Sequence, residues 1–493
     1  AESGTPASLK SIYAGCPAAV LRDIFDNRAH TLPLWFNCAR FLPLVRREGM
    51  LSMIQPAATK VLVIGYVWPE PRSSAASGHV MQILETFLQQ GWDITFSSPA
   101  GPGEHKADLA ALGIREVAIE LNNSSFDHFI SELAPDIVLF DQFMMEEQFG
   151  WRVEKQCPQA LRVLETSDLQ SLRHARHQRL KSRLKVNPDQ NDFSDVFAPA
   201  LRDEFELMAQ TDLARREIAA LYRCDLNLMI SEVEIELLIE QFGLPRQLLH
   251  WCPLMIDPPT VEPAAFADRA NFLSIGNFRH APNWDAVLWM KSTIWPLIRQ
   301  QLPQAQLHIY GAYTPPKAAA LHNASEGFHI MNWAEDALQV MSAARVCLAP
   351  LRFGAGIKGK LVDAMLCGTP SVTTPVGAEA MQGDHTWPGS ISNSAIELAN
   401  TAVALYKDEA RWQEACLAGT QLLTERYQQA IHGPALIEKL RHCQQHLQTL
   451  RNNNFTGSML RHHAHKSTQY MAQWIEAKNR NTTANQDQSG TST

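Results

Sequence analysis

A short run of glycines and lysines, GAGIKGK from Gly354 to Lys360, contains the residue types that point most directly to chemistry. It follows the apolar segment 346–349 and leads into the amphipathic segment 361–367, a pattern that predicts a strand, a glycine loop and a helix. The first N–H groups of a helix have no partner within the helix and carry partial positive charge, so glycines that admit a ligand there form an anion site. Lys358 and Lys360 add full positive charges. The alternative is a plain helix start with turn glycines.

Asp363 lies one turn into this predicted helix. A carboxylate at that place can accept two hydrogen bonds from a ribose, or it can simply complement the helix dipole. The helix is predicted to end at Gly368, and residues 369–374 read as the next strand, which leads into a second turn at 375–379. The whole run therefore predicts a βαβ unit whose first turn carries the candidate ligand-binding residues.

The run from Ala349 to Ala380 resembles the nucleotide-sugar site of retaining glycosyltransferases of the group 1, or family 4, lineage. This resemblance implies an α/β fold of the GT-B type, in which two Rossmann-like parallel-sheet domains face each other across a cleft and a C-terminal helix returns to the first domain. It also implies that Asp363 holds the donor ribose. The donor diphosphate is then held by the loop residues Gly354, Gly356, Ile357, Lys358 and Lys360.

The sequence departs from the common family pattern at Ala355, where many members carry a glutamate eight residues before the acid. The GAGIKGK run instead resembles a variant branch with glycines and lysines. Two further glycine loops follow predicted strands, one with Gly78 and one with Gly276 and Arg279. By the resemblance, Gly78 faces the donor diphosphate, and Arg279 contacts its phosphates. A plain strand-to-helix turn is the alternative at Gly78.

Asp168 follows the apolar strand that begins at Leu161. Ligands of open parallel sheets bind at the carboxyl ends of the strands, so Asp168 is a candidate contact for the donor or acceptor sugar, with a helix N-cap as the alternative. The segment resembles a family motif D-x-H in which Gln170 replaces the histidine. The strongly basic run Arg173–Lys185 predicts contact with an anionic acceptor or a membrane surface, or else a solvated helix face.

We therefore expect a glycosyltransferase that moves a sugar from a nucleotide-diphosphate sugar to a glycan, a lipid-linked or a small-molecule acceptor. The catalytic candidates are Asp168, Arg279 and Lys360, and retention of configuration comes from the resemblance alone. No cofactor and no metal are expected, because the cations can neutralise the leaving diphosphate. The alternatives are a catalytically weak nucleotide-sugar-binding protein, or an epimerase or phosphorylase on the same fold.

Composition excludes other classes. With 43 basic and 51 acidic residues and a formal net charge of −8, the chain of 493 residues lacks the basic surface of a nucleic-acid-binding protein. Its nine cysteines form no CxxC pair and read as reduced thiols. No apolar run approaches the roughly 18–20 residues of a membrane span. These features predict a cytoplasmic protein, with or without peripheral contact at the inner face of the membrane.

The strand-rich first domain is predicted to begin near Lys60, and the proline-rich run at 258–263 predicts a linker. Ser231 followed by Glu234 is the signature of a capping box at a helix start. The predicted organisation is an N-terminal extension at 1–55 without clear structure, a first domain at 56–257, a linker at 258–265, a nucleotide-sugar domain at 266–450, a helical segment at 451–478 and a disordered tail at 479–493.

Overall fold

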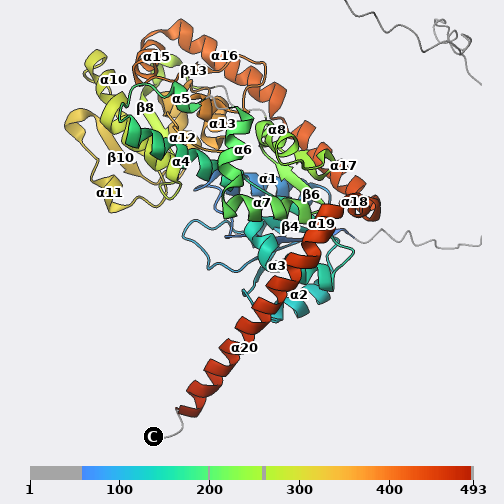
Figure 1. Cartoon of the computed structure of the whole chain (residues 1–493). Helices are drawn as coiled ribbons and strands as arrows, with labels where there is room; N and C mark the ends of the chain where they lie inside the picture. The colour runs from blue at the N-terminus through green and yellow to red at the C-terminus, as the bar shows by residue number, and fades with distance from the viewer. Residues whose placement is uncertain (1–57, 198–199, 258–262, 490–493) are drawn as a thin grey trace, which may run out of the picture. The chain divides into compact units, whose positions relative to one another are not determined.

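The computed structural model describes residues 58–197, 200–257 and 263–489. The predicted N-terminal extension at 1–55 lies outside the described residues, as does most of the predicted linker. Two parallel sheets form the framework of the described part, one of seven strands and one of six (Figure 1).

The first sheet has the strand order β3-β2-β1-β4-β5-β6-β7, and all its neighbours pair in parallel. Alternate residues of β1 enter two different cores: Leu62 and Ile64 join one cluster, and Val61 and Val63 join the other. Both faces of the sheet are therefore covered, as parallel sheets require. The strands are β1 (Lys60–Ile64), β2 (Asp93–Ser98), β3 (Arg115–Ala118), β4 (Ile137–Asp141), β5 (Leu161–Glu165), β6 (Leu226–Met229) and β7 (Leu249–Trp251).

The helices of the first domain connect these strands in the alternating order that the sequence predicts. They are α1 (Ala75–Gln89), η1 (Ala110–Leu112), α2 (Ser125–Leu133), α3 (Phe143–Gln156), α4 (Gln170–Val186), α5 (Ser194–Phe197), α6 (Leu201–Ala209), α7 (Asp212–Arg223), α8 (Glu232–Glu240) and η2 (Arg246–Leu248).

The second sheet has the order β10-β9-β8-β11-β12-β13 and is also parallel throughout. Its strands are β8 (Ala270–Ile275), β9 (Leu307–Tyr310), β10 (Phe328–Asn332), β11 (Ala344–Ala349), β12 (Ser371–Thr373) and β13 (Gly389–Ile391). Its helices are η3 (Phe266–Asp268), α9 (Ala281–Trp289), η4 (Met290–Ile294), α10 (Trp295–Gln301), α11 (Pro316–Ala319), η5 (Ala324–Glu326), α12 (Ala337–Ala343), α13 (Gly359–Leu366), α14 (Pro375–Ala378), α15 (Ala395–Lys407) and α16 (Glu409–Arg426).

The chain returns to the first domain directly after α16, earlier than the predicted domain boundary at residue 450. Ile256 pairs with Gln428 at the crossing, and Leu436 and Leu440 of the next helix join the core around β1. In Figure 1 the later helices run past α7 and α3, which they contact. The returning elements are α17 (Gln429–Gln445), α18 (Leu447–Asn453), α19 (Phe455–Leu460), η6 (Arg461–His465) and α20 (Lys466–Ser489).

Helix α20 continues past Asn479, where the sequence predicted a disordered tail. The ordered turns before this point supply a helical start, and adding a residue to an existing helix is easier than nucleating one. An ion pair between Glu476 and Arg480, one turn apart, supports the extension. No helix in the described part of the chain is long and apolar enough to cross a membrane.

One segment of the first domain packs into the core of the second. We call residues 187–197, between α4 and α6, the strap. The Phe193 side chain is fully buried in the cluster that contains Phe272 and Trp289. The strap also bonds to the backbone of the second domain, with Phe193 N–H donating to Asn393 and Ala395 N–H donating to Asn191.

Candidate functional site

Lys360, Gly276 and Asn283 form a close cluster at the carboxyl ends of β8 and β11. The Lys360 Nζ donates to Asn283 Oδ1 at 2.7 Å. A methyl group on Gly276 would lie 2.6 Å from Asn283 Nδ2 and 2.7 Å from Lys360 Nζ, so a larger residue at this turn would displace both side-chain ends. The structure thus brings together two residues, Gly276 and Lys360, that the sequence placed on separate predicted loops.

Asp363 follows on the same helix as Lys360, one turn further along α13. Burial raises the pKa of the Asp363 carboxyl to about 7, against the effect of the Lys360 cation. Burial lowers the pKa of Lys360 to about 8. At neutral pH the two groups therefore both lie near their titration points.

The start of α1 meets the start of α13 across the two domains. A methyl group on Gly359 would lie only 2.4 Å from the Ala75 Cβ. Gly78, one turn further into α1, has no atom within 4 Å of where a methyl group would be. Two helix N-termini, each with unpaired N–H groups and partial positive charge, therefore lie beside each other.

Asp168 lies at this same junction. A methyl group on Gly356 would be 2.9 Å from the Asp168 Cβ, and Asp168 Oδ2 accepts from Arg173 Nη1 at 2.5 Å. Burial raises the pKa of Asp168, and the Arg173 and Lys358 cations oppose that rise. Arg173 Nη1 also contacts His280 Nε2 at 3.2 Å, which links Asp168 to the Gly276 loop.

The alternative interpretation of Asp168, a helix N-cap, is wrong. The cap position of α4 is Leu169, whose side chain makes no hydrogen bond to the backbone N–H groups of the first turn. Instead Glu217, from α7, accepts from the backbone N–H groups of Gln170 and Ser171 at 2.9 and 3.0 Å. A distant helix therefore supplies the capping carboxylate, and the Asp168 side chain pairs with Arg173 instead.

A buried pair fixes the turn that precedes Asp168. Ser167 has a positive φ of 57°, and its N–H and hydroxyl both donate to Glu165, each at 2.9 Å. Glu165 also contacts His79 Nδ1 of α1 at 3.2 Å. Burial disfavours the charged imidazole, but contacts with Cys252 and Glu165 raise the pKa of His79 to about 10. The α1 start and the Asp168 turn are therefore held by one ion pair.

Lys358 and Ile357 turn inward rather than toward Gly276. The Lys358 Nζ donates to the carbonyl oxygens of Gly356 at 2.6 Å and Ala355 at 3.3 Å, so it closes its own loop. Burial lowers its pKa to about 8 although Glu379, Glu234 and Asp168 lie around it. Ile357 is half-buried against an apolar cluster between the domains. Of the two predicted lysines, Lys360 is the one beside the Gly276 turn.

Arg279 has its contacts elsewhere. Its guanidinium lies over the Tyr313 ring, 3.6 Å from the ring centre, and the Tyr313 hydroxyl donates to Glu70 of the first domain at 2.8–2.9 Å. The backbone N–H of Arg279 donates to Asn277 Oδ1 at 2.8 Å. Within the described residues, the neighbour that reaches the Lys360 side of the loop is His280, whose pKa burial, Arg173, Lys360 and Lys358 together lower to about 3. The sequence did not indicate His280 or Asn283, which lie just after the predicted loop residue Arg279, at and inside the start of α9.

Arg176 joins the domains from within the predicted basic run. Its guanidinium donates two bonds to Glu379, at 2.7 and 2.8 Å, one to the Gly354 carbonyl at 2.9 Å, and one to Glu204 at 2.8 Å. Arg179 also pairs with Glu204. These ion pairs tie α4 to the glycine loop, so part of the basic run serves the interior of the molecule and not a solvated face.

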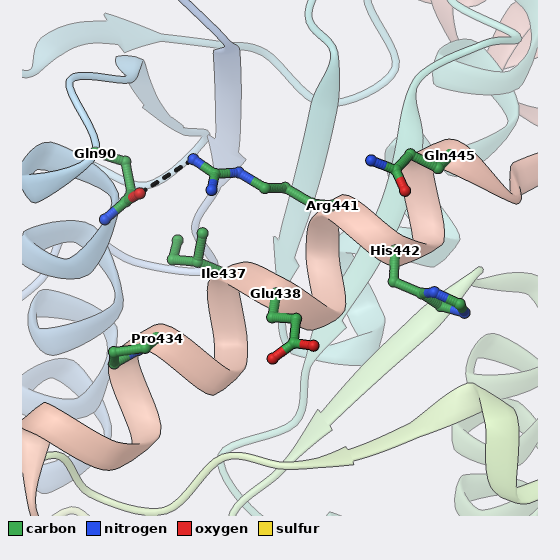
Figure 2. A pocket seen from close by; sticks show the side chains of 7 residues that line it. All are labelled: Gln90, Pro434, Ile437, Glu438, Arg441, His442 and Gln445. Atoms are coloured by element: carbon green, nitrogen blue, oxygen red, sulfur yellow. Dashed lines mark hydrogen bonds between the residues drawn. The ribbon is translucent and has the colours of Figure 1, made fainter. Parts of the chain in front are cut away.

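Two surface depressions have none of the predicted site residues in their lining. One, of about 430 Å³, lies beside Glu379 between the start of α8 and the β12–β13 connection. The other, of about 440 Å³, lies where α17 packs on the end of α1, and there Arg441 donates to Gln90 at 3.1 Å (Figure 2). Figure 2 shows that its lining comes mostly from α17, and none of the predicted site residues is among it.

The second domain matches a known protein family. Residues 269–408, which contain Gly276, Lys360 and Asp363, match the sequence profile described as glycosyl transferases group 1. No curated protein matches the sequence.

Solved structures share the two-domain fold at low identity. HepE from Anabaena, in complex with UDP and glucose, has a TM-score of 0.57 at 13% identity, over 78% of this chain and 100% of that chain. A sucrose-phosphate synthase from Thermosynechococcus elongatus has a TM-score of 0.55 at 16% identity, over 78% and 98%. WaaG, a glycosyltransferase involved in lipopolysaccharide biosynthesis, has a TM-score of 0.51 at 13% identity, over 76% and 98%.

The fold is GT-B, and the second domain is a group 1 glycosyltransferase domain. By this profile match the chain is a glycosyltransferase, as the resemblance in the sequence predicted. The particular role of the GAGIKGK loop stays a prediction.

Proposed function

We propose that this glycosyltransferase uses a nucleotide-diphosphate sugar as donor and that the donor binds at the start of α13. The observation that carries this proposal is the Lys360–Asn283 pair beside Gly276, at 2.7 Å, with Asp363 one turn along the same helix. Lys360 and the unpaired N–H groups of α13 suit a diphosphate, and Asp363 suits the two hydroxyls of a ribose.

The chemical step follows from charge. When the bond between the anomeric carbon and the diphosphate oxygen breaks, negative charge builds up on the diphosphate. Lys360 and the two helix starts are fixed before the reaction, so they stabilise that charge without reorganising. Asp168, whose pKa burial raises, lies against Gly356 of the same loop, and its carboxylate, which pairs with Arg173, is the candidate contact for a sugar hydroxyl. Arg279 stays a candidate phosphate contact that would have to leave Tyr313.

Retention of configuration, independence from metal and cofactor, and the nature of the acceptor are further parts of the proposal. The acceptor is a glycan, a lipid-linked or a small-molecule hydroxyl compound. UDP-sugars are the first donors to test, because the HepE structures hold UDP. Cytoplasmic location, with or without peripheral membrane contact through Arg173–Lys185, stays a prediction.

Thermal shift and calorimetry test the donor. UDP-, GDP-, ADP- and dTDP-glucose are titrated into the wild type, Lys360→Ala and Asp363→Ala, with and without EDTA. Lys407→Ala, an exposed lysine at the end of α15, is the matched control. We expect one nucleotide class to bind, unaffected by EDTA, and both site variants to lose at least about tenfold in affinity, as expected when a charged hydrogen bond is removed.

Turnover separates the enzyme from a binding protein on the same fold. Product formation is followed with the donor that binds, across glycan, lipid-linked and small-molecule acceptors. Saturable binding without transfer or hydrolysis would contradict the proposed catalysis. Binding that is indifferent to both site variants would contradict the proposed place of the donor.

A further inference from the structure

Glu234 makes contacts that its place in the sequence does not predict. In a capping box, the glutamate would reach back to the backbone N–H of Ser231. Only half of the box forms: the Ser231 hydroxyl accepts from the Glu234 N–H at 3.3 Å. The Glu234 side chain is fully buried, and its Oε1 accepts instead from Gly356 N–H at 2.6 Å and Leu169 N–H at 3.3 Å.

The two donors belong to different domains and to the two halves of the site. Gly356 lies in the glycine loop of the second domain, and Leu169 directly follows Asp168 in the first. Gly356 has a φ of +63° and approaches Asp168 so closely that a methyl group would not fit. One carboxyl oxygen therefore holds the loop that carries Lys360 and the turn that carries Asp168 at a fixed separation.

The surroundings of Glu234 fit a positioning role and not an ordinary ion pair. Its second oxygen, Oε2, has no hydrogen-bond partner among the described residues. The charged groups that face it are Asp168 from the β5–α4 turn, Glu379 after α14, and Lys358 at the start of α13. Burial, with the Asp168 carboxylate next, raises the pKa of Glu234 to about 8, so at neutral pH the group is mostly an uncharged acceptor.

We propose that Glu234 is a positioning residue for sugar transfer, which aligns the donor loop of the second domain with Asp168 of the first. The inference rests on the proposed function, because it assigns Glu234 to the alignment of that same site. Glu234 acts through Gly356 and Leu169 and does not itself touch the substrate. What matters is the reach of a single acceptor oxygen, and not negative charge.

Three variants separate the effect of the length of the Glu234 side chain from the effect of its charge. Glu234→Gln keeps the chain length and one acceptor oxygen. Glu234→Asp keeps the carboxyl group but is shorter by one methylene, so it cannot keep both bonds. Glu236→Ala removes an exposed glutamate from the same helix and is the control. We expect kcat to stay near the wild-type value in Glu234→Gln and the control, and to fall about 100-fold in Glu234→Asp, since a shift of about 1 Å in a site costs that much.

Hydrogen exchange supplies a readout that does not depend on activity. The amides of the segment 354–358 are expected to be protected in the wild type and in Glu234→Gln, and to exchange faster in Glu234→Asp. Melting temperatures are measured on the same samples, and rates are compared where all variants are folded. A purely structural role would lower the melting temperature while leaving kcat per folded molecule unchanged.

The outcomes decide the two proposals separately. The positioning role is overturned if Glu234→Asp keeps both wild-type kcat and protection of 354–358, or if Glu234→Gln is as defective as Glu234→Asp. If the wild type neither binds nor transfers any nucleotide sugar, the proposed function fails, and the positioning role in transfer falls with it even where the exchange result shows the contact. If the wild type is active, the kinetic comparison decides on Glu234 alone.

Discussion

Two helix starts carry glycines in this enzyme, and they use them in opposite ways. At α1, Gly78 borders open space, with no atom within 4 Å of an added methyl group. At α13, Gly356 and Gly359 are pressed against Asp168 and Ala75 of the other domain. The sequence predicted the same task for both, which was to let a ligand approach. The difference teaches that glycine in such a turn allows close approach of either a ligand or a neighbouring domain, and only the fold decides which.

Gly356→Ala gives the largest expected effect. The added methyl group meets Asp168 at 2.9 Å and the Ser167 carbonyl at 3.0 Å, on a backbone with a φ of +63°. We expect kcat/KM to fall about 100-fold because the loop must shift away from Asp168. Initial rates with saturating acceptor measure this fall in kcat/KM.

Gly91→Ala is the control for backbone strain, because Gly91 has a φ of +70° and open space around it. It should lose about 1 kcal/mol or more of stability and keep its activity. Equal activity losses in both variants would show that strain alone, and not the domain contact, explains Gly356.

Gly359→Ala tests the contact between the two helix starts. Its methyl group would lie 2.4 Å from the Ala75 Cβ, so the α1 and α13 starts must separate. Adding Ala75→Gly removes the clash, and we expect the double variant to recover most of the lost activity, with a coupling energy of about 2 kcal/mol. Rates for the wild type, both single variants and the double variant complete this double-mutant cycle. Additive losses of activity would mean that the two helix starts act independently.

Donor affinity should depend on pH through the α13 pair. The pKa of Lys360 is lowered to about 8, so its cation is lost as the pH rises through 8. The pKa of Asp363 is raised to about 7, so its carboxylate is lost as the pH falls through 7. Affinity should therefore peak between these values and fall about tenfold for each pH unit beyond either one.

Calorimetry between pH 6 and 9.5 checks this profile. Lys360→Arg should remove the alkaline decline, because arginine keeps its proton. A flat profile in the wild type would exclude both groups from the donor site.

Gly78→Ala gives the smallest expected effect on the protein itself. With no neighbour to displace, alanine should raise the stability by about 0.5–1 kcal/mol through its better helix propensity. Chemical denaturation measures this gain, and donor affinity then reports whether a ligand occupies the open space. A loss of stability would show that α1 needs the glycine for its own packing.

The framework of the molecule could be predicted because local patterns decide it. The apolar run at Lys60–Ile64 and the strand-loop-helix pattern around Gly354 became β1 and the start of α13. The remaining contacts are matters of tertiary structure. Nothing near Glu234 in the sequence indicates that its carboxyl group will accept from the N–H of Gly356, in another domain, and not from the N–H of Ser231. Likewise, nothing near Asp168 indicates that Glu217 will take over the capping of α4.

The basic run illustrates the same limit. Its charge density indicated a surface, and spacing alone could not show that Arg176 would turn inward to Glu379 and the Gly354 carbonyl. Arg279 is the reverse case: the loop was identified, but the Tyr313 ring holds the arginine, and its neighbour His280 faces the lysines. Loops can be found from sequence, whereas the direction of each side chain depends on what packs around it.

The strap has a consequence for modularity. Phe193 belongs to the first domain by its place in the chain, but its side chain is part of the core of the second domain. A fragment that begins after the linker would lack the Phe193 side chain and its contact with Trp289. A chimaera that receives the second domain would have to carry residues 187–197 along with the transplanted half.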